Sequence, residues 1–221
     1  GIISSNPLAD LGLKKVIKHP VDFLSDTQLG ELKEVLSGRD RQKIQARKLY
    51  NEWLSSRGQK LLPDYDELEC FHADYLTPLA RLIMESGLRL SEALSLEWKD
   101  ISSDWQTLTV YASKTQTYRV IPINSEAASL LRTLKRLNAA NIGKDTNKVF
   151  VTSKGDHLKG VKTSWNGVRD KLSFNCDWRM LRRTFGSRLI KKGVSLYAVS
   201  QLLGHSSVKT TEEWYVGLDQ P

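Results

Sequence analysis

The chain has 221 residues and a mass of 25.1 kDa, which fits one ordinary domain with enough length to bury a core. Hydrophobic residues make up 40% and charged residues 26%, a balance that excludes a chain that is mainly disordered or fibrous. No stretch approaches the roughly 18 apolar residues that span a bilayer, and the first residues lack the basic-then-apolar order of a signal peptide. We therefore expect a cytoplasmic protein with no membrane partner.

The cysteines and histidines do not follow a metal-binding or disulfide pattern. Cys70 and Cys176 are far apart, neither has a C-x-x-C partner, and the four histidines are scattered. The sequence therefore predicts neither a bound metal nor a disulfide framework.

The positive charge is concentrated in one segment. The net charge is +8 and the isoelectric point is about 9.4, which favours a polyanionic partner. Residues 154–192 hold eleven basic and three acidic side chains, whereas acidic and basic residues balance in the rest of the chain. This distribution predicts a phosphate-binding surface, with a merely solvated basic face as the alternative.

Apolar spacing along the chain predicts a mainly helical domain. Residues 1–20 contain Pro7 and Pro20 and read as an extended linker, followed by one domain over 21–221. Helices are predicted over 24–38, 39–56, 73–86, 91–96, 126–137, 178–192, 196–203 and 208–216. Ser25 or Asp26 is the expected first N-cap, and Ser91 is the expected cap of the short fourth helix.

Glycines mark several of the expected helix ends, and one pair of strands interrupts the helices. The stops are predicted at Gly38, Gly87, Gly193 and Gly204. The runs 107–112 and 118–123 are rich in β-branched and aromatic residues and predict an antiparallel hairpin with Lys114 near its turn. The expected fold class is mainly α with a small antiparallel β-sheet.

Four motifs, in this order, resemble the tyrosine recombinases of the phage integrase family. They are GLRLSEALSLEW at 87–98, SKTQTYRVIPI at 113–123, RMLRRTFGSRLI at 179–190 and LLGHSSVKTTEEWY at 202–215. The resemblance implies a catalytic domain that closes around double-stranded DNA and needs no metal or nucleotide cofactor. A tyrosine would cleave one strand, form a 3′-phosphotyrosyl bond, free a 5′-hydroxyl and rejoin the strand to another.

The resemblance also implies partners and a source. A homo-oligomer, a tetramer on DNA, is expected, with an isolated fragment possible as a monomer. Position 1 is glycine rather than methionine, so we expect an N-terminal DNA-clamp domain outside this chain. A phage or another mobile element is the expected source.

The resemblance assigns catalytic roles that suit the chemistry. Attack on a phosphodiester builds negative charge, and a metal-free enzyme must meet it with fixed cations, for which the arginine fork is well suited. Lys114 would protonate the leaving oxygen, His205 would donate to the phosphate and Tyr215 would be the nucleophile. The predicted catalytic set is Arg89, Lys114, Arg179, Arg182, His205 and Tyr215, with Glu92 orienting Arg89.

Two departures from the family pattern bear on activity. Arg179 stands where the family carries a histidine, and arginine cannot accept a proton near neutral pH. Tyr215 is the tenth residue after His205, whereas the family places its tyrosine ninth, where this chain has Trp214. One residue rotates a helical side chain by roughly 100°, so the extra residue must be absorbed before the last helix begins.

Further basic residues are expected to contact the DNA backbone, namely Lys162, Arg183 and Lys192. A site-specific recombinase is the leading expectation, and two alternatives stay open. The departures motivate the first, a DNA-binding relative that has lost cleavage. The shared chemistry allows the second, an enzyme similar to type IB topoisomerases that relaxes supercoiled DNA.

Overall fold

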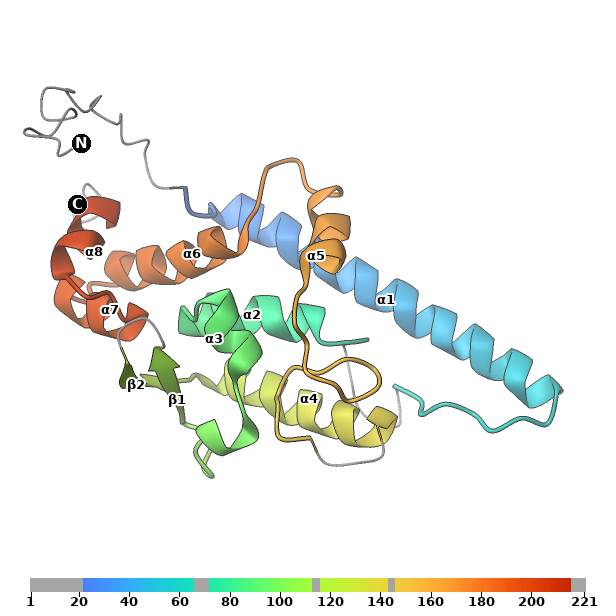
Figure 1. The fold of residues 1–221 in the computed structure, drawn as a ribbon. Coiled ribbons are helices and arrows are strands. Elements are labelled where there is room, and N and C mark those ends of the chain that lie inside the picture. The colour runs from blue at the N-terminus through green and yellow to red at the C-terminus, as the bar shows by residue number, and fades with distance from the viewer. Residues whose placement is uncertain (1–21, 66–71, 113–115, 143–145, 216–221) are drawn as a thin grey trace, which may run out of the picture.

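The computed structural model describes residues 22–65, 72–112, 116–142 and 146–215, with only the backbone for the last two (Figure 1). The described chain is mainly helical with a two-stranded antiparallel sheet, which confirms the predicted fold class. The elements are α1 (Asp26–Ser56), α2 (Leu76–Ser86), α3 (Leu90–Ser95), η1 (Trp98–Asp100), β1 (Thr107–Ala112), β2 (Thr117–Pro122), α4 (Ser125–Ile142), α5 (Lys162–Arg169), α6 (Trp178–Lys191), α7 (Leu196–Leu203) and α8 (Val208–Tyr215). The predicted linker 1–20 lies outside the described residues.

The long helix α1 begins at the predicted cap but passes through the predicted stop. The Ser25 side chain accepts the Gln28 N–H at 3.2 Å, and the Gln28 side chain accepts the Ser25 N–H at 2.9 Å, which closes a capping box. The expected end at Gly38 is wrong, because the helix continues to Ser56. A glycine inside a helix costs only about 1 kcal/mol, so contacts made by the next turn can outweigh it.

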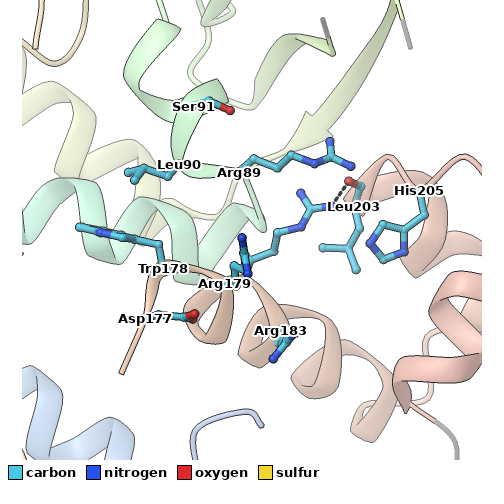
Figure 2. A pocket seen from close by; sticks show the side chains of 10 residues that line it. Arg89, Leu90, Ser91, Asp177, Trp178, Arg179, Arg183, Leu203 and His205 are labelled. Atoms are coloured by element: carbon cyan, nitrogen blue, oxygen red, sulfur yellow. Dashed lines mark hydrogen bonds between the residues drawn. The ribbon is translucent and has the colours of Figure 1, made fainter. Parts of the chain in front are cut away.

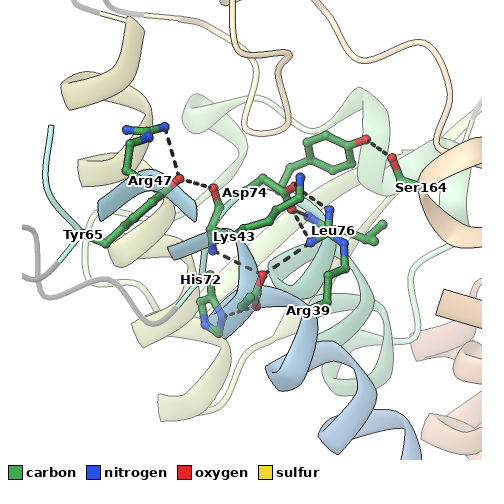
Figure 3. Close-up of polar contacts among 11 residues, drawn as sticks. Arg39, Lys43, Arg47, Tyr65, His72, Asp74, Leu76 and Ser164 are labelled. Carbon is green, nitrogen blue, oxygen red and sulfur yellow. Dashed lines mark hydrogen bonds and ion pairs between the residues drawn. The ribbon is translucent and has the colours of Figure 1, made fainter. Parts of the chain in front are cut away.

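Those contacts form a polar cluster between α1 and the chain that leads into α2 (Figure 3). Both terminal nitrogens of Arg39 donate to the Asp74 carboxylate, at 3.0 and 2.5 Å, and Lys43 Nζ donates to it at 2.7 Å. Asp40, which is buried, accepts the Ala73 N–H at 3.3 Å. Burial opposes ionisation of Asp74, but the hydrogen bonds from Arg39 and Lys43 outweigh it and lower its pKa to about 2. The cluster therefore anchors α1 just beyond Gly38.

Helix α2 occupies the centre of the fold and packs against α1, α3, α4 and α6 (Figure 1). Its side chains Leu79, Ala80 and Ile83 are fully buried. It ends, as predicted, at Gly87, which has φ 65° in the left-handed region. A Cβ atom there would collide with Phe185, so both the backbone conformation and the close approach of α6 require glycine at this position.

The predicted hairpin is present, with Tyr111 opposite Tyr118 in its register. Alternation along β1 and β2 buries Leu108 and Ile121 on one face and exposes the tyrosine pair on the other. Arg119 lies on the same face as Ile121, and its side chain is only 11% exposed. Residues 113–115 lie outside the described part of the chain, so the predicted position of Lys114 stays a prediction.

The last three helices follow the predicted pattern closely. Asp177 caps α6 by accepting the Met180 N–H at 2.7 Å, and Ser195 caps α7. Gly193 and Gly204 both have positive φ, and Gly204 ends α7 as expected. Helix α5 lies in the basic segment and is not among the predicted helices.

None of the described helices is both long and apolar enough to cross a membrane.

Candidate active site

A cleft of about 640 Å³ opens where α3, α6 and the end of α7 meet (Figure 2). Arg89 enters it from the start of α3, Arg179 and Arg183 from α6, and His205 from the residues after α7. The complete lining is Arg89, Leu90, Ser91, Asp177, Trp178, Arg179, Arg182, Arg183, Leu203 and His205. The structure thus brings together four of the six residues predicted to be catalytic, although they are distant in sequence.

Arginine side chains converge on the carbonyl groups at the end of α7. A helix end leaves its last carbonyls without partners and carries partial negative charge, so cations are favoured there. Leu202 O accepts from Arg119 Nε at 3.0 Å, Leu203 O accepts from Arg182 Nη2, and Gly204 O accepts from Arg89 Nη2 at 2.9 Å. Packing of α7 against α6 and β2, together with the bond from Arg89 to Gly204 O, therefore gathers positive charge beside His205.

Glu92, which is buried and does not line the cleft, balances part of this charge. Its side chain is 6% exposed and accepts from Arg89 Nη1 at 2.7 Å and from Arg119 Nη1 and Nη2 at 3.0 and 2.7 Å. Arg182 Nη1 lies 3.9 Å from Oε2. Burial opposes ionisation of Glu92, but hydrogen bonds from Arg119 and Arg89 outweigh it and lower its pKa. Glu92 is therefore a carboxylate that holds the guanidinium groups in place.

Glu92 also sets the start of α3. Its Oε2 atom accepts the backbone N–H of Arg89 at 2.8 Å, so α3 begins after Arg89. The predicted cap at Ser91 is wrong, because Ser91 lies inside the first turn and the glutamate three residues after Arg89 satisfies the free backbone donor instead.

Arg182 and Arg89 differ in how far they are open to the cleft. Arg182 is 9% exposed, donates to Gly87 O at 2.6 Å and to Leu203 O, and so bridges the end of α2 to the end of α7. The Arg89 side chain is 41% exposed, although two of its nitrogens have protein partners. Arg89 thus presents the more accessible guanidinium to a ligand in the cleft.

His205 is tied to α8 and is neutral at physiological pH. Its Nδ1 atom lies 2.8 Å from Oγ1 of Thr211, which is completely buried. Burial lowers the His205 pKa to about 4, and the positive charges of Arg182, Arg89 and Arg119 act in the same direction. Because Nδ1 is occupied, Nε2 is the ring nitrogen left for a further partner.

The remaining predicted residues divide into three groups. Arg179 is exposed at the cleft and Arg183 is half-buried beside it. Lys162 and Lys192 are exposed but do not line the cleft. Lys114 and the side chain of Tyr215 lie outside the described residues, and the Tyr215 backbone forms the last residue of α8.

Arg119 is the site residue that the sequence reasoning missed. It stands between exposed residues of β2, so it read as an ordinary strand residue. The available signal was its spacing of two from Ile121, which places a charged side chain on the apolar face of the strand. A charge in that position needs a partner from within the fold.

Within the described residues, no group of three or more histidine, cysteine, aspartate or glutamate side chains is arranged to hold a metal ion. The cleft itself is lined mainly by cationic and apolar groups, which suit an anion.

A helical domain with one hairpin around an arginine-rich cleft is the fold of the tyrosine recombinase catalytic domain. Solved structures with this fold include an integrase of transposon Tn1549 in complex with transposon right end DNA (TM-score 0.67, 17% identity, covering 97% of this chain and 68% of that one). The catalytic domain of bacteriophage HP1 integrase is also similar (TM-score 0.57, 16% identity, covering 88% of this chain and 86% of that one).

The sequence pattern of the phage integrase family matches residues 52–220, and the chain belongs to this family. Similar curated proteins are the tyrosine recombinases XerC of Chlorobaculum tepidum (30% identity over 224 residues) and of Oceanobacillus iheyensis (28% over 223 residues). Each alignment covers 96% of this chain and 62% of the relative. The chain therefore spans less than two thirds of the length of these relatives.

Proposed function

We propose that this chain is the catalytic domain of a site-specific DNA recombinase that cuts and rejoins strands without a metal. The observation that carries the proposal is the convergence of Arg89, Arg182 and His205 on one cleft, with Glu92 buried behind them. Such a preorganised set of donors and cations matches the charge that develops on a phosphodiester under attack.

The proposed reaction starts with the Tyr215 phenol oxygen attacking phosphorus while the phenol proton is released to water. A 3′-phosphotyrosyl bond forms, the bond from phosphorus to the 5′ oxygen breaks, and Lys114 supplies the proton that leaves with that oxygen. Arg89 and Arg182 stabilise the charge on the non-bridging oxygens. In the second half of the reaction a 5′-hydroxyl attacks phosphorus and gives its proton to Lys114, the bond from phosphorus to the Tyr215 oxygen breaks, and the freed phenolate takes a proton from water.

The position of α8 supports Tyr215 as the nucleophile despite its spacing. Thr211 contacts His205 from this helix, and position 215 follows position 211 by four residues, about one helical turn. The helix begins at Val208, which leaves two residues after His205 to absorb the extra position. The backbone of position 215 therefore lies about one helical turn beyond Thr211, the residue that contacts His205.

Arg179 and His205 occupy the two positions at which the family carries histidines, and their proposed roles differ. Arg179 can donate to a phosphate oxygen at every working pH but accepts no proton. When Thr211 donates its hydroxyl hydrogen to Nδ1, the neutral His205 ring carries its proton on Nε2 and can donate it to the phosphate or position the nucleophile.

The proposed partner is double-stranded DNA, with Lys162, Arg183 and Lys192 of the basic segment on its backbone. We propose that the protein forms a homo-oligomer, a tetramer, on DNA, and that the isolated chain can be a monomer. Residues 1–20 would link this domain to an N-terminal clamp domain. A phage or another mobile element is the proposed source, and a bacterial cytoplasm is the proposed location.

The test is covalent trapping on nicked DNA that loses its 5′-hydroxyl fragment after cleavage. The wild-type chain should form a denaturation-resistant adduct, and Tyr215→Phe should form none while binding the same DNA equally well. Binding without an adduct in the wild type would overturn the proposal and favour a DNA-binding relative that has lost cleavage.

A further inference from the structure

We propose that Arg119 is a positioning residue for strand cleavage, which holds Arg89 and the segment before His205 in their working geometry without touching the DNA. The inference rests on the proposed function and concerns a residue outside the predicted catalytic set. Three features of Arg119 carry it: its internal hydrogen bonds, its burial and its contact with Gly204.

The donors of Arg119 are directed into the protein. Nη1 and Nη2 donate to the two Glu92 carboxylate oxygens at 3.0 and 2.7 Å, and Nε donates to Leu202 O at 3.0 Å. Its side chain is 11% exposed, against 41% for Arg89, and it does not line the cleft. Arg119 is therefore placed to hold other groups rather than to bind a phosphate.

The first group that it holds is Arg89, through Glu92. Oε1 of Glu92 is shared between Arg119 Nη1 and Arg89 Nη1, which lies 2.7 Å away. The parallel pair of bonds from Arg119 fixes both oxygens of the carboxylate, and so fixes the direction in which Oε1 meets Arg89. Without Arg119, Glu92 would keep its bonds to the backbone N–H and Nη1 of Arg89 but lose the pair of bonds that fixes the plane of its carboxylate. The accessible guanidinium of Arg89 would then be held less firmly.

The second group is the end of α7. The Arg119 guanidinium rests against Gly204, where an added Cβ would lie 3.0 Å from Nη1, and its Nε atom bonds the carbonyl two residues earlier. His205 follows directly. Arg119 thus ties strand β2 to the turn that presents His205, and loss of this tie would let the imidazole shift. A displacement of about 1 Å at a reacting centre can cost about 100-fold in rate.

The test measures adduct formation by Arg119→Gln and Arg119→Lys on two nicked substrates. One carries an ordinary scissile phosphate, and the other a methylphosphonate, in which a methyl group replaces one charged oxygen and reduces the need for Arg89. The matched control is Arg132→Gln, which removes an exposed arginine that lies over Trp105, 5.2 Å from the ring centroid.

We expect Arg119→Gln to slow cleavage of ordinary DNA about 100-fold with unchanged DNA affinity. On the methylphosphonate, the cleavage rate of Arg119→Gln should fall below that of wild type by a factor at least about tenfold smaller than on ordinary DNA. The reason is that a misplaced Arg89 charge matters less when the phosphate carries no charge. Arg119→Lys keeps the positive charge but not the forked guanidinium, and its cleavage rate should lie between those of wild type and Arg119→Gln. The control should match wild type on both substrates.

Other results would contradict either the positioning role of Arg119 or the proposed function. Full activity of Arg119→Gln, or an equal loss on both substrates, would show that Arg119 does not act through Arg89. If Arg119→Gln does not fold by circular dichroism, the same ratio measured for Arg119→Lys decides. Absence of an adduct with the wild-type chain on both substrates would instead defeat the proposed function, and this inference with it.

Discussion

Replacement of Glu92 by glutamine should weaken the fold as well as the cleft. The substitution keeps the shape of the side chain but removes the negative charge that Arg89, Arg119 and Arg182 face at 2.7, 2.7 and 3.9 Å. It also turns one carboxylate oxygen into an NH₂ group that points at hydrogen-bond donors. The guanidinium groups would then repel one another in a buried site without compensation.

The size of the effect follows from the burial of the pair. The Glu92 side chain is 6% exposed and Arg119 is 11% exposed, and breaking such a buried pair costs about 3 to 5 kcal/mol. In a chain of this length 1 kcal/mol shifts Tm by about 2 to 4 °C. Glu92→Gln should therefore lower Tm by roughly 6 to 20 °C at pH 7.

Thermal unfolding followed by circular dichroism measures this, with Glu126→Gln as the matched control. Glu126 forms an ion pair with Arg81 in which the two side chains are 41% and 28% exposed, so its loss should cost at most about 1 kcal/mol. The pKa of Glu92 is lowered by folding, so its charge stabilises above the unfolded pKa and the benefit is lost as pH falls. The difference in Tm between Glu92→Gln and wild type should therefore become smaller below about pH 4. A Tm for Glu92→Gln within about 2 °C of wild type at pH 7 would refute the reasoning.

Further predictions concern the cleft and the α1 anchor. Arg179→His should add an ionisation near pH 6.5 to the cleavage profile, and identical profiles would place position 179 away from the phosphate. Thr211→Val should slow cleavage about tenfold by freeing the His205 ring, while Thr211→Ser restores the rate; equal rates for all three would exclude this hydrogen bond from catalysis. Asp74→Asn should cost about 2 kcal/mol in urea unfolding at pH 7, because the Asp74 pKa is lowered to about 2. That difference should disappear as pH falls from 4 toward 2, and its persistence would show that packing, not charge, is responsible.

Local signals predicted most of the helix ends. Gly87 and Gly204 follow amphipathic helical patterns and adopt the left-handed conformation that ends a helix, so the prediction and the structure agree. Gly38 has the same sequence context, yet α1 continues through it. The difference is tertiary, because Arg39 and Lys43 reach Asp74 from the next turn, and a contact so distant in sequence leaves no local pattern.

The site could be predicted in part, through motif order rather than through geometry. The four motifs indicated that Arg89, Arg179, Arg182 and His205 belong together, and the cleft collects them. What no spacing could indicate is that successive carbonyls at the end of α7 each receive an arginine from a different element. The spacing of Arg119 from Ile121 could have indicated that it points into the fold, but not that its partners would come from α3 and α7.

The identity of the residue joined to DNA tests the central claim most directly. The trapped adduct is digested with trypsin and nuclease, and the peptide that keeps a nucleotide is sequenced by mass spectrometry. The account predicts a phosphotyrosyl linkage at Tyr215 and nowhere else. A linkage at another residue, such as Tyr197, which is 64% exposed on α7, would contradict it.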